Sequence, residues 1–253
     1  MLTRNICVCV AVLLLSACSS NPKPDPYADS SAEAIYAEAN ENLKKEHYEN
    51  SVKSYEALEA HFPFGRYTEQ GQLEIIYAYY QADEHPAAIA AADRFIRLHP
   101  RSAHLDYAYY IKGVVKFNET VTFLEKYLPL DPNTRDLDAE KESYHYFAEF
   151  LRRFPDSSYA SDARQRMIYI RNSVAESNYH AGVYYYNRGA YLSAANRSND
   201  IIKHYQGAPV MFEALVLLRQ SYEKLGFNDL TEEINRIIIL NYPHEAIADS
   251  SIL

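Results

Sequence analysis

The sequence predicts an all-α fold in which about five helix hairpins stack into a superhelix. The first observation is a helix end that recurs five times, with a ring-bearing residue at its centre and proline directly after it in four cases. The second is that a large apolar residue stands four positions before each ring, and a small residue eleven positions before it. The third is that glycine stands sixteen positions before the ring in the last two repeats.

The recurring helix end defines the second helix of each hairpin. Offsets of four, seven and eleven residues lie on one face of an α-helix, so a small residue, a large residue and a ring share one stripe. The small residue lets the first helix of the pair approach closely, and the proline ends the second helix. The rings are Phe62, His99, Phe154, Tyr205 and Tyr242; the apolar residues are Leu58, Phe95, Phe150, Ile201 and Ile238; the small residues are Ser51, Ala88, Ser143, Ala194 and Thr231.

The turn between the two helices of a hairpin is expected sixteen residues before the ring. Gly189 and Gly226 hold this position in the last two repeats, and glycine accepts the left-handed conformation that a helix C-cap needs. Glu46 and Asp83 hold the same position in the first two repeats. Upstream of each turn the apolar spacing predicts the first helix of the pair.

This pattern resembles the tetratricopeptide repeat over residues 32–243, although two repeats are longer than the others. Successive rings stand 37, 55, 51 and 37 residues apart. We place the extra residues of the third repeat in an insertion at 119–136, where Pro129 and Pro132 interrupt any helix. The fourth repeat has 14 extra residues and no proline between Asp156 and Gly189, which predicts a lengthened or doubled helix.

The first 17 residues have the pattern of a secretory signal peptide. One cation, Arg4, precedes an apolar stretch of about ten residues, which is too short to span a membrane. The residues Leu15-Ser16-Ala17-Cys18 resemble the lipobox of bacterial lipoproteins. This resemblance implies cleavage before Cys18 and acylation of its thiol and new amino group by fatty acids such as palmitate, which together form a stable anchor.

Residues 18–31 are expected to form a flexible, extended tether between the lipid and the helical region, because three prolines in this stretch prevent a regular helix. The helical region would comprise amino-terminal repeats at 32–118 and carboxy-terminal repeats at 137–243, followed by a tail at 244–253. Since the remaining two cysteines lie in the signal peptide, the mature chain offers no disulfide and no cysteine metal site.

Composition and motifs argue against catalysis and against nucleic-acid binding. The net charge is −9, and it becomes −10 when Arg4 is removed with the signal peptide. No phosphate loop, zinc-protease helix or serine-hydrolase elbow is present. The nine histidines show no paired helical spacing, so we expect no metal, no cofactor and no enzymatic activity.

Long runs of residues resemble the BamD family of outer-membrane protein assembly lipoproteins. They are Phe62-Pro63-Phe64-Gly65-Arg66-Tyr67-Thr68-Glu69-Gln70, Gln72-Leu73-Glu74-Ile75-Ile76-Tyr77-Ala78-Tyr79-Tyr80, Arg94-Phe95-Ile96-Arg97-Leu98-His99-Pro100, Arg188-Gly189-Ala190-Tyr191 and Asn196-Arg197. Gln206 departs from the repeat pattern, since proline stands there in the other repeats.

In enteric bacteria aspartate after the lipidated cysteine marks inner-membrane retention, so Ser19 favours the outer membrane.

The resemblance implies a non-enzymatic scaffold on the periplasmic side of the outer membrane, where membrane contact occurs through the lipid anchor only. Its partners would be the POTRA domains of the barrel subunit BamA, companion lipoproteins such as BamC and BamE, and unfolded outer-membrane β-barrel proteins. The amino-terminal repeats would recognise the client proteins, and the carboxy-terminal repeats would hold BamA.

Two sets of residues are predicted as binding sites, and for each a structural role stays open. Exposed tyrosines among the 24 of the chain would line a groove for aromatic client side chains, with arginines for client carboxylates; otherwise the tyrosines pack within helix pairs. We expect Arg197 to pair with an acidic residue of this chain or of BamA, because it lies near the core stripe. The client set is Tyr67, Tyr77, Tyr80, Arg94 and Arg97; the BamA set is Arg188, Asn196 and Arg197.

One hypothesis from another class is a general periplasmic tetratricopeptide adaptor lipoprotein that coordinates peptidoglycan or cell-division complexes. A sustained heptad pattern would favour it, and the sequence has none. Recovery of peptidoglycan synthases without any barrel protein would identify such an adaptor.

Overall fold

The computed structural model describes residues 25–119 and 137–248, and side chains as far as residue 245. The predicted signal peptide, Cys18 and the first part of the tether lie outside the described residues, as does the predicted insertion except for Glu119, the last residue of a helix. The helices are α2 Ala32–Lys44, α3 Tyr48–His61, α4 Arg66–Gln81, α5 His85–Leu98, α6 Leu105–Glu119, α8 Asp138–Arg153, α9 Ala160–Asn187, α10 Tyr191–His204, α11 Met211–Leu225, α12 Asn228–Asn241 and α13 Pro243–Ala248.

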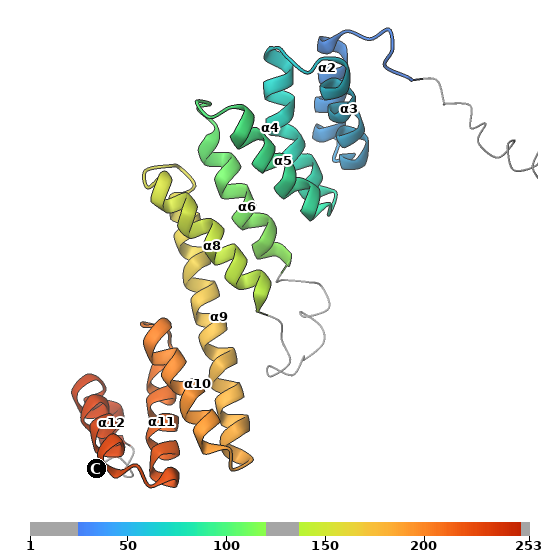
Figure 1. The fold of residues 1–253 in the computed structure, drawn as a ribbon. Coiled ribbons are helices and arrows are strands. Elements are labelled where there is room, and N and C mark those ends of the chain that lie inside the picture. Colours follow the sequence, from blue (N-terminus) through green and yellow to red (C-terminus); the bar gives the residue numbers. More distant parts are fainter. Residues whose placement is uncertain (1–24, 120–136, 249–253) are drawn as a thin grey trace, which may run out of the picture.

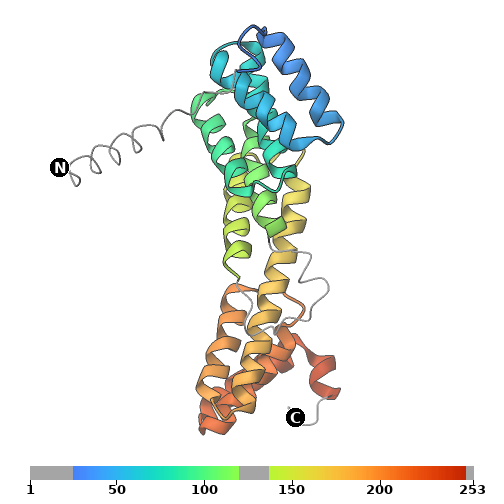
Figure 2. The ribbon, with the colours of Figure 1, turned by 90° about the vertical axis from the view of Figure 1, so that its right-hand side faces the viewer.

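The described residues form five stacked helix hairpins, which confirms the predicted all-α repeat fold. The hairpins are α2/α3, α4/α5, α6/α8, α9/α10 and α11/α12 (Figure 1). Each second helix also packs on the first helix of the next hairpin. The stack is elongated, with α2 and α3 at one end and α11 and α12 at the other (Figure 2). Within the described ranges no helix has both the length and the hydropathy of a membrane span.

The residues of the predicted stripe lie where the repeat pattern places them. The five large apolar residues are at most 1% exposed. Each ring residue is the C-cap of its helix, and its backbone N–H donates to the carbonyl of the apolar residue four positions earlier. Four of the five small residues are fully buried, and the fifth, Thr231, is half-buried.

The four predicted turn residues all adopt the left-handed conformation. Glu46 and Asp83 have φ angles of 60° and 59°, and Gly189 and Gly226 have φ angles of 77° and 74°. This agreement confirms the register of the hairpins, because the conformation falls at the same repeat position whether or not glycine is present. Glu46 and Asp83 therefore accept a backbone strain that glycine avoids.

The fourth repeat is extended by one long helix, which confirms the first of the two predicted alternatives. Helix α9 has 28 residues, against 13 to 16 in the first helices of the other hairpins. Its first half packs against α6 and α8, and its second half packs against α10 and α11 (Figure 1). The described core accordingly forms two clusters: Ile170 and Val174 of α9 belong to the first, and Ala175 belongs to the second.

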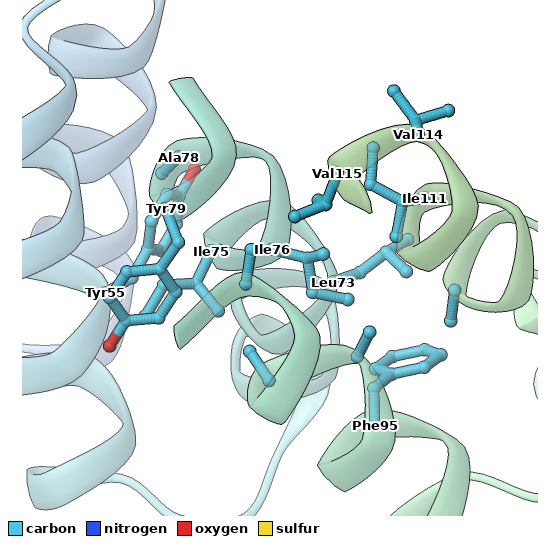
Figure 3. Packing of buried hydrophobic residues seen from close by; sticks show 14 of the residues in the cluster. Tyr55, Leu73, Ile75, Ile76, Ala78, Tyr79, Phe95, Ile111, Val114 and Val115 are labelled. Atoms are coloured by element: carbon cyan, nitrogen blue, oxygen red, sulfur yellow. The ribbon is translucent and has the colours of Figure 1, made fainter. Parts of the chain in front are cut away.

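The first cluster spans the three amino-terminal hairpins and the start of α9. Tyr55, Ile75 and Tyr79 pack between α3 and α4, and the cluster continues through Ile76 and Phe95 towards α6 (Figure 3).

At the other end of the stack, α13 begins at the proline that ends α12. Proline suits the first position of a helix, so one residue ends α12 and starts α13 where we expected only a tail.

Candidate binding surfaces

The first helices of the amino-terminal hairpins, α2, α4 and α6, share one surface, which we call the first-helix face. Tyr67 lies on this face, with its ring centroid 5.3 Å from that of Tyr36 in α2. The guanidinium carbon of Arg66 lies 5.0 Å from the centroid of the Tyr67 ring. Tyr67 is half-buried, so part of its ring remains available to a ligand.

A single carboxylate, that of Glu74, holds the first-helix face together. Its two oxygen atoms accept hydrogen bonds from Tyr36 Oη at 3.1 Å, Asn40 Nδ2 at 3.2 Å, Tyr55 Oη at 2.6 Å and Gln70 Nε2 at 2.8 Å. These donors come from α2, α3 and α4, so one side chain ties three helices together. Burial raises the pKa of Tyr36 to about 12, and the nearby negative charge of Glu74 is the second-largest cause of this shift.

Tyr77 and Tyr80 continue this face towards α6. Their ring centroids lie 6.3 Å apart, and Tyr77 is 38% exposed. Tyr80 is half-buried: its hydroxyl is a hydrogen-bond partner of Asn118 in α6, and its ring stacks on His85 with centroids 6.2 Å apart. Burial raises the pKa of Tyr80. Neighbouring rings that are partly exposed and held in place suit an apolar or aromatic peptide.

The two arginines of the predicted client set lie on a different helix from these tyrosines. Arg94 and Arg97 belong to α5, a second helix, and Arg94 Nη2 forms an ion pair with Glu59 Oε2 of α3 at 2.7 Å. Arg97 is exposed. The three tyrosines belong to the first helix of this hairpin and the two arginines to its second helix, so a groove that uses both rings and guanidinium groups stays a prediction.

The predicted BamA set lies at the turn after α9, where Arg188 is the C-cap, and in the middle of α10, where Asn196 and Arg197 are adjacent. The side chains of Arg188, Asn196 and Arg197 are exposed, and the guanidinium carbon of Arg188 lies 4.5 Å from the centroid of the Tyr184 ring. Arg197 Nη1 donates to Asn178 Oδ1 of α9 at 2.9 Å. This partner is a neutral amide, so pairing of Arg197 with an acidic residue of BamA stays a prediction.

Sequence reasoning missed two polar side chains that organise the amino-terminal hairpins. Glu74 interrupts an otherwise apolar run, and that interruption is the signal that could have revealed it. Lys112 is 8% exposed; its Nζ lies 2.7 Å from Asp93 Oδ1 and 4.3 Å from the centroid of the Tyr146 ring. Its partners come from α5 and α8, so no local pattern around Lys112 indicates them.

Known proteins resemble the chain over nearly its whole length. The profile of the family described as "Outer membrane lipoprotein", YfiO, matches residues 28–237. An outer membrane protein assembly factor BamD of Neisseria meningitidis is 42% identical over 235 residues, covering 91% of this chain and 88% of its own. The BamD proteins of Xylella fastidiosa and Vibrio cholerae are each 32% identical; they cover 91% and 92% of this chain and 79% and 95% of their own. Among solved structures, the MamA protein is 17% identical with a TM-score of 0.32, over 85% of this chain and 93% of its own.

Proposed function

The chain belongs to the BamD family of outer membrane protein assembly factors, and we propose that it acts as a non-enzymatic scaffold lipoprotein for the folding and insertion of outer-membrane β-barrel proteins. Its partners on this proposal are the POTRA domains of BamA, companion lipoproteins such as BamC and BamE, and unfolded β-barrel proteins. The scaffold faces the periplasm and is held at the outer membrane by lipid on Cys18.

One observation carries the proposed recognition of clients: the partly exposed rings of Tyr67, Tyr77 and Tyr80 on the first-helix face. Aromatic rings bury a large area when a peptide covers them, and they favour other rings at centroid distances of about 4.5–7 Å. The hydrogen bonds to Glu74 support this assignment, because they hold α2 and α4 in place beneath the rings. A surface that is already rigid loses little entropy when it binds.

Client binding is tested with Tyr77→Ala in the full chain, using a labelled peptide that copies the carboxy-terminal strand of a β-barrel protein. Tyr77 is exposed, so its truncation spares the core, and we expect the affinity for the peptide to fall about three- to tenfold. The matched control is Leu98→Ala, which removes an exposed apolar side chain from the end of α5. Equal effects of the two variants would remove the first-helix face from client recognition.

BamA binding is tested separately with Arg197→Leu. We expect weaker binding to the POTRA domains, because leucine lacks the guanidinium that a carboxylate of BamA would contact, and Asn178 no longer holds that group in place. Lys203→Leu is the matched control, because it also removes one positive charge, from an exposed position of the same helix. Unchanged affinity of an intact Arg197→Leu protein would exclude Arg197 from the interface.

The complex itself is tested by crosslinking and pull-down from detergent-solubilised outer membrane. We expect recovery of BamA and β-barrel proteins, whereas peptidoglycan synthases without any barrel protein would overturn the proposal in favour of a general envelope adaptor.

Cys18→Ala is expected to release the protein from the membrane and leave its repeats folded. Unfolding of that variant would contradict the separation of anchor from scaffold.

A further inference from the structure

A notch opens at the middle of α9, between the start of α8 and the end of α10, which are the second helices of two successive hairpins. The first turns of α8 and the last turn of α10 both reach this point, because each packs along a different half of α9 (Figure 1). Lys141 and Tyr144 contribute from α8, and His204 and Tyr205 contribute from the end of α10. None of these lining residues belongs to α2, α4 or α6, so the notch is separate from the first-helix face.

The notch has an apolar floor and a volume of about 310 Å³. Ile170 and Val174 of α9 form the floor, and each is only 2% exposed. Tyr144 is 42% exposed and Tyr205 is half-buried, so ring surface borders the floor on two sides. This volume is at the lower end of ligand sites, which suits one or two side chains rather than a folded surface.

Two cations line the same notch in a chain whose net charge is −9. Arg171 donates from Nη1 to the carbonyl of Gln206 at 3.2 Å, from Nη2 to the carbonyl of Gly207 at 2.9 Å, and from Nε and Nη2 to Asn172 Oδ1 at 3.1 and 2.9 Å. These partners are neutral, so they leave its charge uncompensated. Lys141 Nζ lies 3.2 Å from Asp138 Oδ1, but both side chains are mostly exposed, and such pairs contribute little. His204 lies in a similarly exposed pair with Asp200 at 3.7 Å.

We propose that this notch binds a short acidic and apolar segment of a protein partner. One bulky apolar side chain would cover Ile170 and Val174, and an adjacent carboxylate would lie between Lys141 and Arg171. Charge complementarity selects an anionic occupant, and the apolar floor selects one with a large side chain beside the charge. Arg171 is already held by two carbonyl groups of the loop after α10, so its guanidinium needs little ordering on binding.

The probe is a blocked octapeptide with a central Leu-Glu-Leu sequence, in which one leucine is replaced by a benzophenone amino acid for photo-crosslinking. The full chain in detergent is irradiated with this peptide, and the crosslinked residues are mapped by mass spectrometry. We expect crosslinks at residues 141–144, 170–174 and 204–205. A matched peptide with glutamine in place of glutamate should crosslink about five- to tenfold less, because the charged hydrogen bonds are lost.

Lys141→Gln and Tyr144→Ala test the notch from the protein side. Both side chains are largely exposed, so neither substitution threatens the core, and each should lower the crosslinking yield about fivefold. Lys203→Gln, on α10 but outside the notch, is the control and should not change the yield. Equal yields with the two peptides, crosslinks elsewhere, or an equal loss in Lys203→Gln would overturn the proposal. Displacement by inorganic phosphate as effective as by the glutamate peptide would also overturn it, because it would indicate a simple anion site.

Discussion

Gly113 of α6 lies directly against the ring of Phe147 in α8. A Cβ atom at position 113 would stand 2.6 Å from Phe147 Cδ1 and Cε1, closer than any unstrained contact allows. The hydroxyl of Ser143 donates to the carbonyl of Gly113 at 2.9 Å, so the two helices touch at a second point. The third hairpin therefore depends on close approach at its centre.

Gly113→Ala is expected to destabilise the protein by about 1–3 kcal/mol, because the fully buried Phe147 ring has no room to move away from the added methyl group. Urea unfolding followed by circular dichroism measures the change. Ser193→Ala, at an exposed position of α10, is a control of similar size and should change the free energy of unfolding by less than about 0.5 kcal/mol. Equal stability of Gly113→Ala and the parent protein would refute the close packing of α6 on α8.

Asp83→Gly and Glu46→Gly are expected to stabilise the protein by about 0.5–1 kcal/mol each. The left-handed conformation costs a residue with a Cβ about 1–2 kcal/mol, and the greater chain entropy of glycine offsets part of that gain. Thermal unfolding of each variant tests this expectation. Glu49→Gly, three residues later but inside α3, should instead destabilise by about 1 kcal/mol, so glycine must have opposite effects at the two positions.

The turn residues indicate why so much of the fold was predictable from the sequence. Glutamate rarely adopts the left-handed conformation and aspartate does so only occasionally, yet the register set by Gly189 and Gly226 predicts the turn at Glu46 and Asp83. In a repeat protein the conformation expected for one hairpin also predicts that of the others, because each hairpin satisfies the same packing constraints. The 28-residue length of α9 followed in the same way, from repeat spacing and from the absence of proline.

The binding surfaces were less predictable, because they depend on which layer a helix occupies. Tyr77 and Arg94 lie in neighbouring segments of the sequence, but on the first and the second helix of one hairpin. The notch beside α9 was not predicted either. Lys141 and His204, which are 63 positions apart in the sequence, line the notch beside the middle of α9. No local sequence pattern predicts that these two residues lie near each other.

Tyr55→Phe is expected to cost about 1–3 kcal/mol of stability. The Tyr55 hydroxyl makes the shortest hydrogen bond to Glu74, at 2.6 Å, and the residue is only 2% exposed, so its loss leaves a carboxylate oxygen short of a donor. Chemical denaturation measures the cost, with the exposed Tyr184→Phe as the matched control. If both variants lose the same small amount, Glu74 does not organise the three helices.

Stability is expected to decline at alkaline pH. Burial, and next the nearby charges of Glu74 and Glu142, raise the pKa values of Tyr36 and Tyr146 respectively to about 12. Below about pH 10 these tyrosines hold their protons in both states; between about pH 10 and 12 the unfolded chain loses them first, so the free energy of unfolding falls as pH rises. Denaturation midpoints across this range, with Tyr36→Phe for comparison, measure the effect. A smaller pH dependence is expected in the variant, and an identical one would contradict the shift at Tyr36.

Glu176→Pro is expected to uncouple the two ends of the stack. Glu176 is exposed near the middle of α9, just after Ala175, where the second core cluster begins. Proline there removes a helical hydrogen bond and clashes with the preceding turn, at a cost of about 3 kcal/mol or more. Because the described helices α8 and α10 are joined through α9 rather than packed on each other, this break should convert unfolding into two separate transitions. Calorimetry would resolve them, and Glu176→Ala, which keeps the helix, should unfold like the parent protein. A single cooperative transition in Glu176→Pro would show that contacts other than the continuous helix couple the two cores.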